Sequence, residues 1–212
     1  MPPLKKWRIH PMLPLSDLLY AAAYEEEDLN DLSVDADLAE SLTLGSIDIR
    51  SSTFRNCTFS SCHFQMTGFS EVTFADCDLS GCRFTDGGLR NVTFIRCRLT
   101  GTVFLDCALN ACRFQDCSAP YIGFGGSTLK SCRFVACRCP DGGFRSCKFQ
   151  RSAFSECDLT HCDFSGCALR DMDFTTCTTE NTSWPADGVR GMIVREDQAL
   201  ELSRLLGIRI LM

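Results

Sequence analysis

Residues 54–64 read FRNCTFSSCHF, so that Phe and Cys each return every fifth residue. All sixteen phenylalanines of the chain lie at positions that differ by multiples of five, and leucines fill most of the gaps in this series, which we call the centre position. A period of five fits neither an α-helix of 3.6 residues per turn nor a continuous strand, which would send successive centres to different faces. The chain must therefore turn within every five residues.

A second period, of twenty residues, gives the number of sides in each coil. Two series of centres spaced by twenty are aromatic throughout: Phe54, Phe74, Phe94, Phe114, Phe134, Phe154 and Phe174, and Phe64, Phe84, Phe104, Phe124, Phe144, Phe164 and Trp184. The two series between them, which begin at Phe59 and Phe69, are mostly Leu. Four centres in twenty residues predict an all-β solenoid of four-sided coils. About seven coils stack from residue 46 to residue 190, which gives a rod about 34 Å long.

The cysteines follow the same period. Fifteen of the sixteen lie two residues before a centre, and Cys139 occupies a centre itself. Residues two apart in an extended segment point to the same side, so these cysteines face the core with the centres. One ladder at twenty-residue spacing is complete: Cys57, Cys77, Cys97, Cys117, Cys137, Cys157 and Cys177. Because Thr67, Val72, Gly87, Thr102 and Ser127 occupy equivalent positions, we interpret Cys as a small hydrophobe and expect free, unreactive thiols.

Three units, CDLSG (77–81), CDLTH (157–161) and CDFSG (162–166), resemble the repeats of the pentapeptide-repeat family, and the resemblance covers residues 46–190. It implies a right-handed quadrilateral parallel β-helix, the handedness being supplied by the resemblance. It also implies an end-to-end homodimer, because related proteins with similar C-terminal helices form one. Some bacterial members bind type II topoisomerases and protect them from quinolones or toxins, and they are thought to imitate DNA through an acidic surface.

The segments outside the repeat are predicted to cover the ends of the solenoid. Residues 1–45 form an N-terminal capping segment with a helix over 15–28, N-capped by Ser16. Residues 191–212 form a helix over 195–207 and a short strand. The apolar residues of this segment are expected to mediate dimerisation, or simply to cap a monomer: Leu200, Leu202, Leu205, Leu206, Ile208 and Ile210.

Charge and composition limit the location and the partners of the chain. The formal charge of −6 comes from residues 1–45, which hold nine acids and three bases, whereas residues 46–190 hold fifteen of each. No apolar stretch approaches the ~18 residues of a membrane span, and Pro14 and Asp17 interrupt the apolar run near the N-terminus. We therefore expect a cytoplasmic protein in a reducing compartment, with no membrane association.

The sequence offers no pattern typical of catalysis or of cofactor binding. His10, His63 and His161 lie on the cap and at outer repeat positions without a recognisable nucleophile. Consecutive cysteines belong to different walls, so four of them would not converge on one zinc ion. We predict no catalytic residues, no metal and no cofactor. Redox chemistry of Cys137 and Cys139, or of the thiol ladder, stays open.

One outer column is cationic. On the wall that contains Phe69, the residue after the centre occurs eight times between positions 50 and 190. None of the eight is an acid, and five are cations: Arg50, Arg90, Lys130, Arg170 and Arg190. The column is either an ordinary solvated face or a docking stripe for an acidic partner surface or a nucleic-acid backbone. Elsewhere, Ala119 and Cys139 are small centres, each followed by proline. This pattern predicts a bend or flattened patch that displays Tyr121, from repeat decay or for a partner.

These features favour a non-catalytic interaction module or scaffold whose partner is another protein; direct nucleic-acid binding is not expected. The alternative is a protein that binds DNA gyrase or another type II topoisomerase. The neutral coils and the cationic column depart from the acidic surface of that subset, and the sequence shows no inserted loops. The third hypothesis is a thiol redox or metal-buffering protein.

Overall fold

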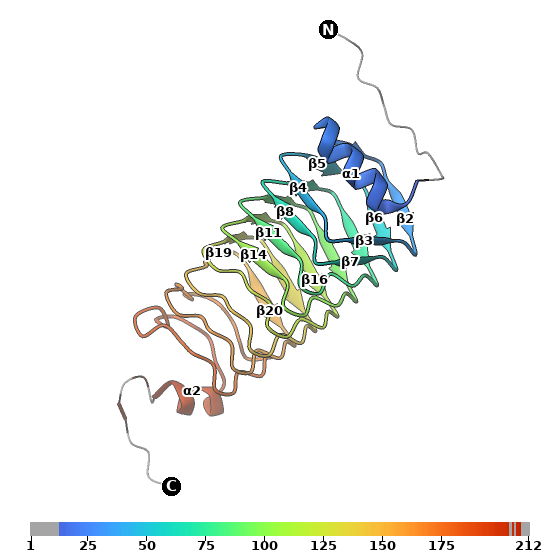
Figure 1. Ribbon diagram of the computed structural model, residues 1–212. Helices are drawn as coiled ribbons and strands as arrows, with labels where there is room; N and C mark the ends of the chain where they lie inside the picture. The colour runs from blue at the N-terminus through green and yellow to red at the C-terminus, as the bar shows by residue number, and fades with distance from the viewer. Residues whose placement is uncertain (1–12, 204, 206, 209–212) are drawn as a thin grey trace.

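The computed structural model describes residues 13–203, 205, 207 and 208. Within them the chain winds into a rod of stacked coils with a helix at each end (Figure 1). Strand partners run parallel and lie twenty residues apart, as Phe74 pairs with Phe54 and Phe94. The strands form four sheets. The four-sided parallel β-solenoid predicted from the sequence is therefore confirmed.

We number the four sides of the rod as walls 1 to 4. Wall 1 contains β1 (Leu29–Asn30), β5 (Asp48–Arg50), β9 (Gly68–Ser70), β12 (Gly88–Arg90), β15 (Ala108–Asn110), β17 (Thr128–Lys130) and β19 (Lys148–Gln150). Wall 2 contains β2 (Ser33–Asp35), β6 (Thr53–Arg55), β10 (Thr73–Ala75), β13 (Thr93–Ile95), β16 (Arg113–Gln115), β18 (Arg133–Val135) and β20 (Ala153–Ser155). Wall 3 contains β3 (Leu38–Glu40) and β7 (Thr58–Ser60). Wall 4 contains β4 (Thr43–Gly45), β8 (His63–Gln65), β11 (Arg83–Thr85) and β14 (Val103–Leu105).

The core consists of two stacks of aromatic rings that meet edge to face. Phe114 of wall 2 stacks on Phe94 and Phe134 with ring centroids 4.8 and 4.6 Å apart. It also meets Phe104 and Phe124 of wall 4 at nearly right angles. All the phenylalanines and cysteines predicted for the core are buried. Burial of each ring contributes about 1.5–3 kcal/mol, and stacked or edge-on pairs add to this.

The corners are made by the second residue after each centre. Its backbone is left-handed in all coils except at Thr176 and Ala186, with φ from 49° at Ser51 to 83° at Gly191. Glycine adopts this conformation without strain, but most coils use Asp, Asn, Ser or another residue there. The repeated left-handed residue turns the chain every five residues, as the period requires.

Strands give way to turns along the rod. In such a turn the N–H three residues after the centre donates to the carbonyl of the centre, as Cys82 N donates to Leu79 O at 3.1 Å. The turn appears at these centres: Leu79, Leu99, Ala119, Cys139, Leu159 and Thr179 of wall 3, Phe124, Phe144 and Phe164 of wall 4, Leu169 and Val189 of wall 1, and Phe174 of wall 2. Isolated parallel bridges continue the stacking between most of these coils.

The coils begin one turn earlier than expected. β1 pairs with β5 in parallel register, so the coils start at Leu29 rather than at residue 46. Leu29, Val34, Ala39 and Leu44 keep the centre spacing but lack Phe and Cys, which hid this coil in the sequence. The preceding helix α1 (Leu15–Glu25) covers the end of the rod with buried Leu15, Leu19 and Ala22.

The start of α1 also differs from the prediction. Ser16 lies within the helix rather than at its N-cap, and its hydroxyl donates to Leu38 O at 3.0 Å. The N–H of Leu15 donates instead to Asp37 Oδ2 at 2.8 Å. The first coil therefore supplies the capping carboxylate, which a local sequence pattern does not reveal.

The C-terminal helix α2 (Glu196–Ser203) is shorter than the predicted 195–207. Gln198 is its buried residue, and its amide donates to Phe174 O and Cys177 O at 3.1 and 3.0 Å. These bonds satisfy two carbonyls at the end of the rod. Leu206, Ile210 and all but the first residue of the predicted C-terminal strand lie outside the described residues.

The two prolines of wall 3 do not interrupt it. Ala119 N donates to Arg138 O at 2.7 Å, and Tyr121 N donates to Pro140 O at 3.0 Å. The residue after the centre in these turns needs no ladder partner: Ser80 N donates to the side chain of Asp78 at 2.9 Å. Proline suits this position because it fixes φ for a turn. Pro120 and Pro140 therefore remove no ladder hydrogen bond from wall 3.

Candidate interaction surfaces

The cationic column lies on wall 1, where the strand register aligns its members. Arg50 ends β5, Arg90 ends β12 and Lys130 ends β17, with Ser70, Asn110 and Gln150 between and beyond them. Arg170 and Arg190 follow in the turns that continue the wall. Arg90, Lys130, Arg170 and Arg190 are exposed, and Arg50 is half-buried. The fold thus brings together the five cations that the sequence selected.

Arg50 differs from the other four because its charge is compensated. Its guanidinium donates to Asp28 Oδ2 at 2.8 Å and also contacts Asp48. The hydrogen bond to Asp28 is the main cause that raises the pKa of Arg50 above its ordinary value. Asp28 and Asp48 precede the wall 1 centres of the first two coils, and they lie beside the column that contains Arg50. The N-terminal end of the column therefore presents no net positive charge.

The cations further along the wall have weaker partners. Arg90 Nη2 donates to Ser70 Oγ at 2.8 Å, which leaves its charge uncompensated. Arg170 lies 3.8 Å from the exposed carboxylate of Asp171. Lys130 and Arg190 form no ion pair with any of the residues that the structure describes. These four side chains present positive charge to solvent.

Tyr121 lies on a different face. It occupies the corner after the Ala119 centre of wall 3, with left-handed backbone, and its side chain is 64% exposed. It is displayed as the sequence predicted, but the structure does not bring it onto the cationic column of wall 1. A partner that contacts both would have to wrap around the rod.

The thiols have a role that the sequence reasoning missed. Twelve of the sixteen cysteine sulfurs lie against the carbonyl of a centre in the preceding coil: Cys77 Sγ lies 3.4 Å from Phe54 O, and Cys82 Sγ lies 3.1 Å from Phe59 O. Thr102 and Ser127 donate to the equivalent carbonyls at 2.8 and 3.0 Å. Thr and Ser at this position were a signal that a donor, as well as a small side chain, is favoured there.

All sixteen thiols are free and buried. Burial is the main cause that raises the pKa of Cys107 to about 11 and that of Cys162 to about 12. Cys139, which occupies a centre position itself, is also buried, and burial raises its pKa well above the ordinary value. Raised pKa values keep these three side chains as neutral thiols, which are poor nucleophiles near neutral pH.

Other reactive groups are scattered. His63 Nε2 lies 2.9 Å from Thr85 Oγ1 on the neighbouring strand, and His161 Nδ1 lies 3.5 Å from Asp141 Oδ1. The structure describes neither a third residue that orients His63 nor, within residues 13–203, 205, 207 and 208, a group of three metal-ligating side chains. His10 lies outside these residues.

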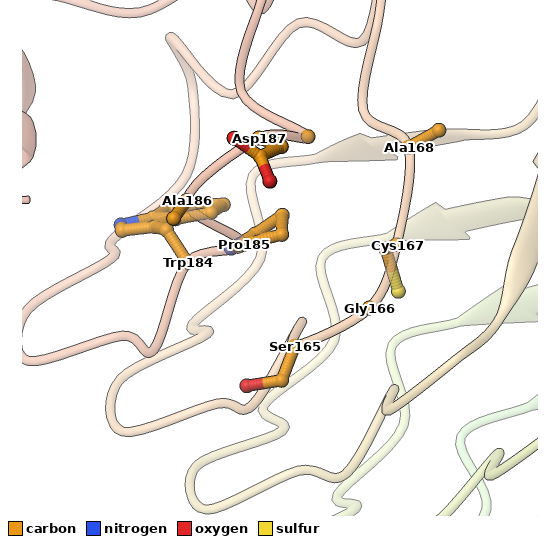
Figure 2. Close-up of a pocket in the computed structure, with 9 residues that line it drawn as sticks. Ser165, Gly166, Cys167, Ala168, Trp184, Pro185, Ala186 and Asp187 are labelled. Carbon is orange, nitrogen blue, oxygen red and sulfur yellow. The ribbon is translucent and has the colours of Figure 1, made fainter.

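A hollow of about 510 Å³ opens between the last coils (Figure 2). It is lined by Ser165–Ala168 on one side and by Trp184, Pro185 and Asp187 on the other. Asp187 is the one charged side chain among the lining residues. The hollow has no acid and base pair that would support catalysis.

The C-terminal end exposes apolar side chains. Leu200, Leu205 and Ile208 are 53%, 42% and 52% exposed, and Ile193 in the last coil is 49% exposed. Leu202, in contrast, is partly buried and packs against the core. Leu202 therefore anchors α2, whereas the other three face away from the rod.

The walls, corners and thiol ladder define the class: a four-sided parallel β-solenoid built from five-residue units. The chain belongs to the pentapeptide-repeat family. A family model described as a pentapeptide repeat region matches residues 47–124 and 68–141, and one described as pentapeptide repeats (8 copies) matches residues 144–178. The family resemblance predicted from the repeats is confirmed.

The solved structures to which the chain is similar include QnrB1, a plasmid-mediated fluoroquinolone resistance protein. It is 19% identical with a TM-score of 0.39, over 87% of this chain and 100% of that chain. HetL, a pentapeptide repeat protein involved in heterocyst differentiation regulation from Nostoc sp. strain PCC 7120, is 11% identical with a TM-score of 0.28, over 87% and 98%. No curated protein sequence matches the chain. Neither α1 nor α2 is long and apolar enough to cross a membrane, nor is any other described helix.

Proposed function

We propose that the protein is a non-catalytic interaction module that presents wall 1 to another protein. The observation that carries this proposal is the exposed cationic column on one continuous wall, which runs from a parallel sheet into stacked turns. Arg90, Lys130, Arg170 and Arg190 stand on a rigid surface, which fixes their spacing before a partner arrives. The partner contacts would be ionic and salt-sensitive, with Arg50 contributing less because Asp28 and Asp48 already compensate it.

Tyr121 would be a second, separate contact. Its exposed ring is supported by the bond from its N–H to Pro140 O, and tyrosine is frequent in protein interfaces. Because it lies on another face, a partner confined to wall 1 would not need it. A Tyr121→Ala variant would therefore show whether one partner wraps around the rod.

We also propose that the C-terminal end forms a homodimer. Exposed Leu200, Leu205 and Ile208 support this contact, because apolar side chains that gather at one end are typical of interfaces. Leu202 would position α2. Leu206 and Ile210 belong to the same proposal on sequence grounds. We further infer a reducing, cytoplasmic location, in which sixteen free thiols would persist.

The narrower alternative is binding of a type II topoisomerase. It rests on the resemblance to the topoisomerase-binding members of the family, and the cationic column of wall 1 departs from an imitation of DNA. The test is a DNA gyrase supercoiling and quinolone-induced cleavage assay with the purified protein titrated in. Protection or inhibition at about micromolar protein would place topoisomerase binding first.

The same assay, and pull-down experiments for other partners, should include two matched variants. One changes Arg90, Lys130, Arg170 and Arg190 to Ala. The control changes four exposed arginines of the other walls to Ala: Arg55, Arg83, Arg113 and Arg138. Binding that the first variant loses and the control keeps would support wall 1 as the docking surface. Equal loss in both would leave only a general charge effect.

A thiol titration tests the third hypothesis. Native protein should leave nearly all sixteen cysteines unreacted, and all should react after denaturation. Rapid reaction of most thiols in the native fold would instead favour a redox or metal-buffering function.

A further inference from the structure

Wall 1 carries charges of opposite sign at its two ends. We call the residue before each centre and the two residues after it the outward positions. Up to Glu71, the outward positions of wall 1 hold four acids (Asp28, Asp31, Asp48, Glu71) and one base (Arg50), a net charge of −3. Its outward positions from Arg90 onward hold six bases (Arg90, Lys130, Lys148, Arg151, Arg170, Arg190) and one acid (Asp171), a net charge of +5. The sheet is therefore polarised along the rod.

The two ends cannot neutralise each other within one molecule. β1 and β19 are six strand spacings apart at the two edges of the sheet, or about 29 Å, and β5 lies near the N-terminal end of the rod whereas β19 lies further along it (Figure 1). This separation exceeds the screening length of about 8 Å in physiological salt. Lys130, Lys148 and Arg151 form no ion pair within the described part of the chain. Their compensation must come from outside the molecule.

The middle of wall 1 is built from small side chains. Gly68, Gly88 and Ala108 precede the centres of β9, β12 and β15, and Ser70 and Asn110 follow two of these centres. A second sheet could approach this strip to the distance of about 10 Å at which sheets pack. The strip lies between the acidic and the cationic end, where a symmetric contact would have its centre.

We propose that wall 1 binds wall 1 of a second copy of this chain, face to face and antiparallel. A two-fold axis along β12 would place β1 of one molecule over β19 of the other. Asp28 and Asp31 would then face Lys148 and Arg151 of the second copy, and the symmetry makes this contact twice. A parallel arrangement would oppose like charges. This inference rests on the proposed function of wall 1 as a docking surface and names its partner.

The contact is expected to be weak. Strands of three residues are about 10 Å long, so seven of them cover about 300 Å² of each molecule. A stable complex buries about 800 Å² per partner. The charges are exposed, which limits each ion pair. Association should therefore occur at about 10⁻⁵ to 10⁻⁴ M and should weaken steeply with salt. Salt should affect the apolar C-terminal contact little.

The arrangement has two mismatches. Arg50, which Asp28 and Asp48 already compensate, would face Lys130 of the second copy, because β5 would lie over β17. Arg90 lies on the proposed two-fold axis and would face its own copy in the second molecule. Arg90→Ala should therefore strengthen self-association about two- to fivefold, whereas an unrelated acidic partner would lose affinity. An increase in affinity would indicate a second copy of the chain as the partner of wall 1, and a decrease would indicate an unrelated acidic partner.

The experiment is sedimentation velocity on the full chain over a range of concentrations, at about 50 mM and about 500 mM NaCl. We expect the higher salt to weaken association at least about tenfold. Asp31→Arg and the double variant Lys148→Glu, Arg151→Glu should each weaken it by a similar factor. An equimolar mixture of the two variants should restore it, because the reversed ends complement each other.

Arg and Glu both occur at the corner position in this fold, as Arg96, Glu71 and Glu156 show, so the corner substitutions fit the backbone. The control is Arg83→Glu with Arg138→Glu, which reverses two exposed cations on walls 4 and 3 and should leave association unchanged. Association that ignores salt and both wall 1 variants, a failed rescue, or a monomer throughout would overturn the proposal. Loss of binding to other proteins with self-association intact would overturn only the scaffold function.

Discussion

Wall 2 and wall 3 follow the same five-residue period, yet wall 2 is a sheet of seven strands and wall 3 has two strands followed by turns. The centre alone does not cause this difference, because Phe124 and Phe144 of wall 4 are aromatic centres that lie in turns. The residue after the centre is Ser, Thr, Pro or Glu in the turns of wall 3, and β-branched Ile95 and Val135 follow two centres of wall 2. Ser60 and Ser155 nevertheless end strands β7 and β20, so this residue contributes to the choice between strand and turn but does not decide it.

The largest difference between the walls should appear on truncation of their centres. Phe114→Ala removes a ring from the continuous stack of wall 2 and should lower the free energy of unfolding by about 4 kcal/mol. Leu99→Ala at a buried centre of wall 3 should cost about 3 kcal/mol. Urea unfolding measures both. Equal losses would show that ring stacking does not distinguish the walls.

Proline substitution should separate strand from turn. Ile95→Pro places proline at the last residue of β13, a central strand of the wall 2 sheet, and should cost about 3 kcal/mol, because proline distorts a central strand. Ser80→Pro copies Pro120 and Pro140 on wall 3. It removes a hydroxyl that is buried without a partner, and it also removes the N–H that donates to Asp78. These effects oppose each other, so stability should change by less than about 0.5 kcal/mol. A destabilised Ser80→Pro variant would contradict the proposed turn geometry.

The cysteine ladder between the centres of wall 2 and wall 3 should make the free energy of unfolding depend on pH. The Cys137 thiol and burial together raise the pKa of Cys157 to about 11. As the pH rises, the unfolded thiol loses its proton before the native thiol does. The contribution of Cys157 to the free energy of unfolding is therefore complete below about pH 9 and is lost between about pH 9 and pH 11. Loss of about 2 kcal/mol is expected from this residue. Unfolding measured from pH 7 to pH 11 should show a shallower decline in Cys157→Ser.

The smallest effect is expected for exchange of a thiol for a hydroxyl in the same ladder. Cys117→Ser should keep the bond to Phe94 O, as Thr102 and Ser127 do at equivalent positions, and should change stability by less than about 1 kcal/mol. Thermal unfolding of Cys117→Ser beside the wild type measures this. A loss above about 2 kcal/mol would mean that sulfur packing, rather than a small donor, defines the position.

The candidate surface was predicted in part. The modulo-twenty spacing placed Arg50, Arg90 and Lys130 in one column, because stacked coils repeat every side at that interval. Compensation of Arg50 by Asp28 was hidden, since Asp28 belongs to a first coil without Phe or Cys. Gln198 was also hidden, because its partners, the carbonyls of Phe174 and Cys177, become neighbours only when α2 folds back onto the last coil.

The sequence by itself determined the four-sided coil, the aromatic core and the inward thiols, because a strict period leaves one arrangement that buries every centre. The tertiary structure decided which sides became strands. Ala108–Asn110 forms strand β15, whereas the Leu169 centre, also preceded by Ala, lies in a turn. Local composition is similar at the two sites. Whether a side forms a strand or a turn depends on the coils stacked on it, because ladder hydrogen bonds require stacked corners to share one geometry.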